Sequence, residues 1–151
     1  MEADAQSDRG ETVMAYWLFK TEPETWSWQQ QKKKGLAGEL WNGVRNHQAA
    51  GNMKAMKTGD WGFFYHSGEE RAVVGIVEVI AEYAPDLTDP SGRFGLVAVK
   101  AVRDLPRPVT LAEIKANPKL SQMVLVKNSR LSVQPVTPAE WKIVCAVGGL
   151  K

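Results

Sequence analysis

The sequence is poor in the residues that build disulfide frameworks and metal sites. It contains one cysteine, Cys145, and two histidines, His47 and His66, among 151 residues. An internal disulfide is therefore excluded, and no pair of these side chains has the spacing of a structural zinc site. We expect Cys145 to be a small buried hydrophobe, and we expect no metal and no cofactor. A single free thiol fits a reducing compartment, which is the cytoplasm of a bacterium or the nucleus of a eukaryote.

Long apolar runs and catalytic motifs are also missing. No stretch has the length and apolar character of a membrane span. Residues 1–14 are polar and acidic, lack the apolar centre of a signal peptide, and are expected to be a disordered tail before one domain over residues 15–151. No phosphate-binding glycine loop or nucleophile elbow is present, so no catalytic residue is assigned.

Positive and negative charges are nearly balanced in this sequence. The formal net charge is +2, which is well below that of proteins that coat a nucleic-acid backbone. A nucleic-acid partner would therefore be contacted over a small footprint. The run of lysines at 32–34 is interpreted as the solvated last turn of a helix, although a phosphate contact is the alternative.

Tryptophan, by contrast, is abundant, with six copies in this short chain. An indole ring fills a core and stacks on flat ligands equally well. We expect most of the six in the core and about two at a ligand surface, because tryptophan is favoured where binding energy is concentrated.

Apolar periodicity and capping patterns predict an α+β fold. Long neighbouring strands joined by short loops favour an antiparallel or mixed sheet that curls into a small barrel, flanked by short helices. A bend is expected at Gly75, and Pro106 and Pro108 are expected to end the strand that precedes them. The predicted strands cover 15–20, 61–66, 71–83, 94–105 and 131–136, with an extended piece at 39–41; the predicted helices cover 27–34, 46–57, 110–117 and 137–146.

Polar and aromatic residues gather where these strands end. Aromatic faces for stacking and polar groups that read a base edge are the parts of a nucleobase pocket. In the alternative interpretation, the aromatic residues fill the core, the asparagines cap and turn, and the arginine makes a surface ion pair. The residues concerned are Lys20, Thr21 and Glu22, then Trp41, Asn42, Arg45 and Asn46, and finally Phe63, Tyr65, His66 and Ser67.

Several blocks of the chain resemble the EVE domain family, over residues 15–147 and in the order found in that family. The resemblance implies a PUA-like barrel related to the YTH domains, which read N6-methyladenine in RNA. It further implies a non-catalytic role in recognising modified bases, including modified cytosines in DNA. The blocks are Lys20-Thr21-Glu22-Pro23 within 16–23, Trp41-Asn42-Gly43-Val44-Arg45-Asn46 within 41–49, the segments 55–60 and 63–67, and the closing segment 130–136.

The resemblance also implies where a flipped-out base would be held. By comparison with the YTH domains, residues 20–22 and 41–42 shape the pocket, with residues 64–67 at its floor or rim. Thr21 stands where a serine is common, and Trp26 and Trp28 are candidates for further aromatic walls, with core packing as the alternative. The predicted ligand-binding residues are Lys20, Thr21, Glu22, Trp26, Trp41, Asn42, Val44, Arg45, Asn46, Tyr65, His66 and Ser67.

Two other functions remain open at this point. A nucleic-acid- or nucleotide-processing enzyme would need an acid or base in the pocket, for which Glu22 and His66 are the candidates. A protein-interaction module would use the polar loop at 85–93 as its contact surface. The preferred hypothesis is a reader of modified bases in DNA or RNA.

Overall fold

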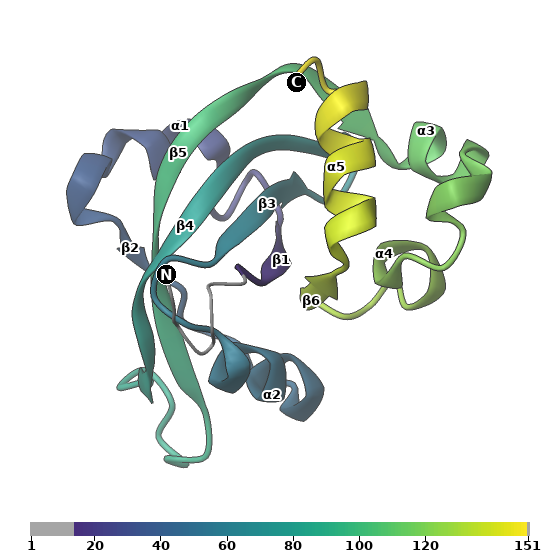
Figure 1. Cartoon of the computed structure of the whole chain (residues 1–151). Helices are drawn as coiled ribbons and strands as arrows, with labels where there is room; N and C mark the ends of the chain where they lie inside the picture. Colours follow the sequence, from purple (N-terminus) through teal and green to yellow (C-terminus); the bar gives the residue numbers. More distant parts are fainter. Residues whose placement is uncertain (1–13, 151) are drawn as a thin grey trace, which may run out of the picture.

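The computed structural model describes residues 14–150. The disordered tail predicted for residues 1–14 lies, apart from Met14, outside the described residues. The remainder folds as an α+β domain in which short helices flank one curled sheet (Figure 1). This architecture confirms the predicted fold class.

Six strands form a mixed sheet in the order β2-β5-β4-β3-β1-β6. β1 is parallel to β3 and antiparallel to β6, and the other neighbours are antiparallel. No pairing between β2 and β6 closes the sheet within residues 14–150, so the curled sheet is open. The strands are β1 (Tyr16–Thr21), β2 (Glu39–Leu40), β3 (Trp61–His66), β4 (Ala72–Pro85), β5 (Gly95–Thr110) and β6 (Val133–Val136).

The helices begin where the capping patterns predict them. Ser27, Thr110 and Thr137 each form a capping box with the Gln or Glu three residues later, and Asn46 caps a fourth helix through its side chain. The short elements η1, η2 and α4 were not predicted. The helices are α1 (Trp28–Lys33), η1 (Gly35–Ala37), α2 (His47–Ala55), α3 (Leu111–Ala116), η2 (Pro118–Leu120), α4 (Val124–Lys127) and α5 (Pro138–Val147).

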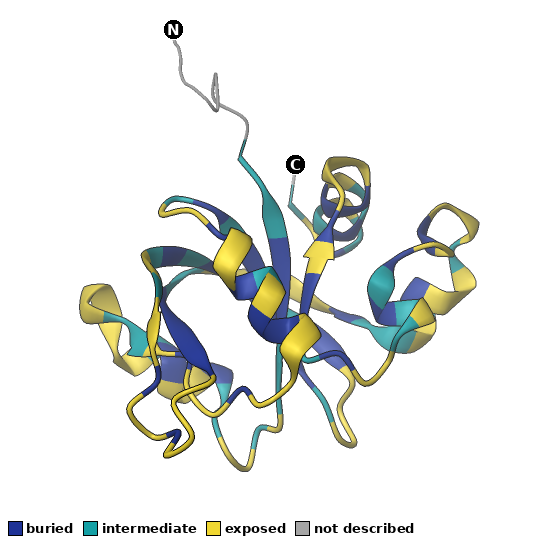
Figure 2. Ribbon diagram, turned by 90° about the horizontal axis from the view of Figure 1, so that it is seen from below, coloured by how far each residue is buried: buried dark blue, intermediate teal, exposed yellow. Residues whose placement is uncertain are grey.

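Two hydrophobic clusters cover the two faces of the sheet. Side chains alternate between the faces along each strand. Trp17 and Phe19 of β1 therefore pack in one cluster with residues of α1 and α2, whereas Leu18 packs in the other with residues of α3, α4 and α5. Figure 2 shows the buried residues of the strands and the helix faces turned toward them. Strand alternation thus decides on which side each functional candidate lies.

β5 continues past Pro106 and Pro108 to Thr110, so the prediction that these prolines end the strand is wrong. The pairing with β4 stops at Asp104 and resumes at Val109, opposite Val73. The two prolines lie inside this interruption, where the missing N–H groups cost no ladder hydrogen bond. A bulge therefore lets one strand accommodate both prolines.

At Gly75, where a bend was predicted, the pairing of β4 with β5 shows a register shift between Val73 and Gly75. The indole of Trp28 lies directly against this point of β4. A Cβ atom added at Gly75 would stand 2.1 Å from the ring of Trp28. The glycine therefore allows α1 to pack closely on the sheet.

Candidate functional site

A cavity of about 340 Å³ opens beside β2 and the end of β1. Its volume lies within the range of small-ligand sites in proteins. Seven of the predicted site residues line it: Lys20, Thr21, Trp26, Trp41, Asn42, Val44 and Arg45. The sheet pairing brings these segments together, because the segment that holds Trp41 follows β2 and bonds β5 through the Trp41 N–H and the Val97 carbonyl at 2.8 Å.

The core fixes the orientation of the Trp41 indole. Its ring centroid lies 5.2 Å from that of Phe19 at 65° and 5.8 Å from that of Phe64 at 86°. Both are edge-to-face contacts, which aromatic pairs favour. Trp41 is 8% exposed, so most of the ring packs in the core and only a small part of the residue is open. Trp41 was predicted to be either a core residue or part of the pocket wall, and in the structure it is both.

Trp26 and Trp28 separate into two roles. Trp26 lines the cavity, and its Nε1–H donates to Gln31 Oε1 at 2.9 Å. Gln31 is fully buried and donates in turn to the Val99 carbonyl at 3.2 Å, which ties the orientation of Trp26 to β5. Trp28 is instead a core residue whose Nε1–H donates to Asp104 Oδ1 at 2.6 Å.

Thr21 joins three parts of the site. Its hydroxyl donates to the Trp26 carbonyl at 3.0 Å, and its own carbonyl accepts from the Ser67 N–H at 2.9 Å. Because the hydroxyl proton is directed to Trp26, the remaining lone pairs of Oγ1 are acceptors. Thr21 Oγ1 can therefore accept, but not donate, a further hydrogen bond.

The two cations of the cavity wall are already engaged. Lys20 Nζ contacts the Ser129 carbonyl and lies 5.7 Å from the centroid of the Tyr65 ring. Burial lowers the pKa of Lys20. Arg45 donates from Nη1 to Asp86 Oδ2 at 3.0 Å and from Nη2 to Thr88 Oγ1 at 3.0 Å. Arg45 therefore connects the cavity to the β4–β5 loop, which comprises residues 86–94.

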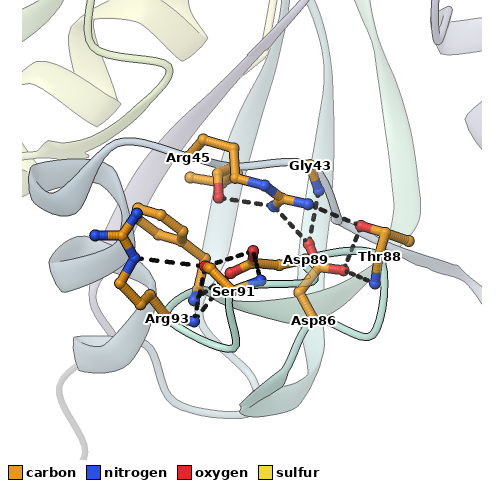
Figure 3. A network of polar contacts seen from close by, with 9 residues as sticks. Gly43, Arg45, Asp86, Thr88, Asp89, Ser91 and Arg93 are labelled. Carbon is orange, nitrogen blue, oxygen red and sulfur yellow. Dashed lines mark hydrogen bonds and ion pairs between the residues drawn. The ribbon is translucent and has the colours of Figure 1, made fainter.

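Asp86 anchors this loop to the cavity wall (Figure 3). Its carboxylate accepts from the Gly43 N–H at 2.9 Å, from Arg45, and from the Thr88 N–H at 2.8 Å and hydroxyl at 2.6 Å. Burial alone would raise the pKa of Asp86, but the hydrogen bonds from Thr88, Gly43 and Arg45 outweigh it and hold the pKa far below its usual value. The side chain is 0% exposed. The anchor is thus an ionised carboxylate enclosed by donors.

Asp89 organises the second half of the loop in the same way. Its carboxylate accepts from the Ser91 hydroxyl at 2.7 Å, and from the N–H groups of Ser91, Arg93 and Phe94 at 2.9, 3.0 and 2.8 Å. Hydrogen bonding from the Ser91 side chain, opposed by burial and assisted by the backbone donors, lowers the pKa of Asp89 to about 2. Figure 3 shows each carboxylate with its own donors. The two groups are joined through the backbone, where the Asp89 N–H donates to the Asp86 carbonyl at 3.0 Å.

Tyr65, His66 and Ser67 do not line this cavity. Tyr65 alternates with Phe64 along β3 and packs in the cluster on the opposite face of the sheet. His66 accepts from the Trp28 N–H through Nε2 at 3.0 Å and pairs with Glu70 Oε1 through Nδ1 at 2.7 Å. His66 therefore supports the start of α1 and lines a separate cavity of about 460 Å³ that also includes Asp104.

Glu22 and Asn46 also lie outside the lining of the cavity. The carbonyl of Glu22 accepts from the N–H groups of Thr25 and Trp26 at 2.9 and 3.0 Å, and its side chain is exposed. Asn46 Oδ1 accepts from the Ala49 N–H at 2.8 Å as the N-cap of α2. Both residues shape the local backbone next to the cavity.

The cavity also contains residues that were not predicted. Glu39 and Leu40 directly precede Trp41 in the sequence, so the prediction for Trp41 could have been extended to both residues. Ser132 offered no local signal, because it reaches the cavity through long-range pairing in which the Lys20 N–H donates to its carbonyl at 2.8 Å. The unpredicted lining residues are Thr25, Glu39, Leu40, Gly43 and Ser132.

Within residues 14–150, no three His, Cys, Asp or Glu side chains converge in a way that could hold a metal ion. Burial raises the pKa of the partly buried Cys145 thiol to about 11. None of the helices in this part of the chain has the length and apolar character needed to cross a membrane.

Comparison with known proteins places these features in a family context. The model of the EVE domain matches residues 15–147. Protein Atu2648 from Agrobacterium tumefaciens is 56% identical, with a TM-score of 0.88 over 90% of this chain and 94% of that chain. Thymocyte nuclear protein 1 from Homo sapiens is 32% identical, over 89% of this chain and 74% of that protein.

Two solved complexes resemble the fold. Human THYN1 protein in complex with 5-methylcytosine containing DNA is 32% identical, with a TM-score of 0.85 over 91% of this chain and 99% of that chain. The YTH domain of Zygosaccharomyces rouxii MRB1 protein, in complex with N6-methyladenosine RNA, is 17% identical, with a TM-score of 0.55 over 93% of this chain and 90% of that chain. The second likeness concerns the fold alone and agrees with the expected relation to YTH domains.

Proposed function

Because the chain belongs to the EVE domain family, we propose that it is a non-catalytic reader that binds one modified nucleobase of DNA or RNA in the cavity beside β2. The single observation that carries this proposal is the composition of the cavity wall, which combines two oriented tryptophans with polar groups. The relation to human THYN1, solved with 5-methylcytosine containing DNA, supports a nucleic-acid partner. Such a reader acts where nucleic acid is found, in a bacterial cytoplasm or a nucleus.

Stacking supplies the first part of the binding energy. Stacking of a base on an aromatic side chain contributes about 1–3 kcal/mol per base. Trp26, held through Gln31, is the more exposed of the two rings, whereas Trp41, held by Phe19 and Phe64, offers only the small part that the core leaves open. Rings fixed before binding lose little side-chain entropy when the base enters, so more of the stacking energy is retained as affinity.

Thr21 allows the cavity to distinguish bases by the hydrogen-bonding groups at their edge. Its hydroxyl proton is directed to the Trp26 carbonyl, so Oγ1 accepts from the ligand. Cytosine and adenine each carry an exocyclic amino group that donates at this edge, whereas the corresponding group of thymine is a carbonyl acceptor. We therefore expect the cavity to prefer a modified base that retains an amino N–H.

Apolar side chains in the cavity wall allow it to distinguish a methylated base from an unmodified one. Val44 and Leu40 line the same cavity as the tryptophans. A methyl group placed in a fitted apolar contact is worth about 1–3 kcal/mol. Asn42 lies at the same wall with an exposed side chain, and its amide both donates and accepts. It is a candidate partner for a hydroxymethyl substituent or for a ring nitrogen.

The position of the titratable groups supports binding without catalysis. The two candidates for acid–base work, Glu22 and His66, do not line the cavity, and His66 is engaged by Trp28 and Glu70. Glu39 is the carboxylate of the wall, and it pairs with Lys34 at 3.2 Å. Arg45 is 38% exposed while it holds Asp86, so its guanidinium is available to a flanking phosphate.

Binding of short oligonucleotides tests the proposal. The set pairs unmodified DNA and RNA with versions that carry 5-methylcytosine, 5-hydroxymethylcytosine or N6-methyladenine, and tryptophan emission reports binding. We expect tighter binding to one modified member. Trp41→Ala should abolish this preference, whereas Trp61→Phe, on the opposite face of the sheet beside Trp141, should retain it.

Thr21 provides a second, more specific test. Thr21→Val removes the acceptor and should weaken binding of the preferred base by about tenfold, the value of one hydrogen bond whose partner is left unpaired. Thr21→Ser keeps the hydroxyl and should bind like the parent. Equal binding of all oligonucleotides by the parent protein would refute the reader function.

A further inference from the structure

Leu87 is the most exposed large hydrophobic residue of the described chain, at 94%. It belongs to the β4–β5 loop, where it contributes nothing to either hydrophobic cluster. The two carboxylates of this loop are buried at Asp86 and Asp89. The surface of the loop therefore presents an apolar side chain without an exposed carboxylate beside it.

The residues on both sides of Leu87 are bonded to the cavity wall. Asp86 accepts from the Gly43 N–H and Arg45 Nη1, and Thr88 Oγ1 accepts from Arg45 Nη2. Consecutive Cα atoms are about 3.8 Å apart, so these bonds hold Leu87 next to the wall. Figure 3 shows how Gly43, Arg45, Asp86 and Thr88 converge. The hydrogen bonds of Asp86 and Thr88 thus fix the backbone position of Leu87 at the edge of the cavity.

We propose that Leu87 is a wedge that enters the base stack of duplex DNA when the neighbouring modified base is turned into the cavity. This inference rests on the proposed function. Extruding a base from a duplex costs unstacking and unpairing energy, and apolar side chains inserted between base steps are a known way to kink and open a stack. The wedge fills the space that the extruded base leaves.

The surroundings of the loop suit a duplex. Arg45, which holds Asp86 and lies 6.0 Å from the Phe94 ring centroid, and the exposed Arg93 provide positive charge where the loop joins β4 and β5. Lys54, 5.5 Å from the Tyr83 ring centroid, lies at a small cavity that Arg93 also lines. Cations near the loop can contact the phosphates of a duplex that Leu87 opens. A single strand has no paired stack to open, so Leu87 should matter for duplex DNA only.

A matched pair of variants tests the wedge. Leu36, 83% exposed on η1, is a leucine of similar exposure that is not part of the cavity lining or the loop. Leu87→Ser and Leu36→Ser are compared in binding a duplex with one central modified base and the same modified strand alone. An adenine next to the modified base, paired with thymine, is replaced by 2-aminopurine, which keeps that pair and whose fluorescence rises when it is unstacked.

We expect Leu87→Ser to weaken duplex binding by about tenfold or more and to abolish the rise in 2-aminopurine fluorescence. Its binding to the single strand should change by less than about twofold, as for an ordinary surface substitution. Leu36→Ser should behave like the parent in both assays, and Leu87→Met should restore duplex binding. Equal urea midpoints for all variants exclude a folding defect.

Different results overturn different statements. If Leu87→Ser binds duplex and single strand like the parent, the wedge is wrong and the reader function stands; Leu87 is then a candidate contact for a protein partner. If it weakens both equally, Leu87 contacts the bound strand and is no wedge. If the parent protein binds no modified oligonucleotide in either form, the reader function falls, and the wedge falls with it.

Discussion

At Gly75 the backbone of β4 touches the indole ring of Trp28. A methyl group added there meets ring atoms at 2.1 Å, and the ring is held by the bond from its Nε1–H to Asp104. Gly75→Ala should therefore reduce the free energy of unfolding by about 1–3 kcal/mol, as other overpacked sites do. Urea denaturation measures the change.

Gly51 supplies the matched control. It lies in α2, and a Cβ added there meets no atom within 4 Å. Gly51→Ala should raise the free energy of unfolding by about 0.5–1 kcal/mol, because alanine restricts the unfolded chain and favours a helix. A loss of stability at Gly51 equal to that at Gly75 would show that close contact with Trp28 is not the cause.

Asp89 makes the stability of the protein depend on pH in the acid range. Its pKa is about 2 in the folded protein and near 3.8 when unperturbed. Because the folded value is the lower one, the stabilising contribution is complete above about pH 4 and is lost as the pH falls through about 2. Asp89→Asn removes this ionisable group.

Unfolding midpoints in urea at a series of pH values test this expectation. At pH 7 Asp89→Asn should be less stable than the parent, and the difference should shrink between pH 4 and pH 2. A difference that stays constant over this range would show that the charge of Asp89 is not what holds the loop. Glu24→Gln, at an exposed position, is the control substitution.

Among the elements, α5 depends on its N-terminal capping box. Thr137 Oγ1 accepts from the Glu140 N–H at 3.2 Å, and Glu140 Oε1 accepts from the Thr137 N–H at 3.0 Å. Thr137→Ala should lower the free energy of unfolding by about 1 kcal/mol. Thr137→Ser should retain most of the parent stability. Thermal or urea unfolding followed by circular dichroism distinguishes the two.

Elements with a local signature were predictable from the sequence, whereas their long-range relations were not. The capping boxes at Ser27, Thr110 and Thr137 mark helix starts because the hydrogen bonds that form them lie within four residues. The continuation of β5 through Pro106 was not predictable, since the cost of a missing N–H depends on the neighbouring ladder.

In the candidate site, too, local sequence patterns were more informative than long-range pairing could be. From the residues alone Trp41 could be core or pocket, and the family resemblance favoured the pocket; in the structure Trp41 packs in the core cluster and also lines the cavity. Tyr65 was included because the family resemblance implied that the whole segment 64–67 lies at the floor or rim of the pocket, but alternation along β3 turns Tyr65 to the other face. Ser132 was missed because only the pairing of β1 with β6 brings it to the cavity.

The whole molecule carries a net charge of +2, and this limits how strongly salt can control binding. Each phosphate neutralised on B-DNA changes the slope of log K against log salt by about −0.9. We expect a slope no steeper than about −4 for a modified duplex, because Arg45 and Arg93 with few neighbours make the contacts. Titrations at four salt concentrations measure it; a steep slope near −10 would indicate a long electrostatic footprint instead.

β1 lies between β3 and β6, and these two partners enter the chain at very different stages of synthesis. On the ribosome β1 is made first, its parallel partner β3 follows, and β6 comes near the end of the described sequence. Until then one edge of β1 is an unpaired template, with Trp17 and Phe19 lacking part of their covering. A nascent chain that lacks β6 is therefore exposed to chaperones and proteases, and synthesis of β6 is the step that closes this edge.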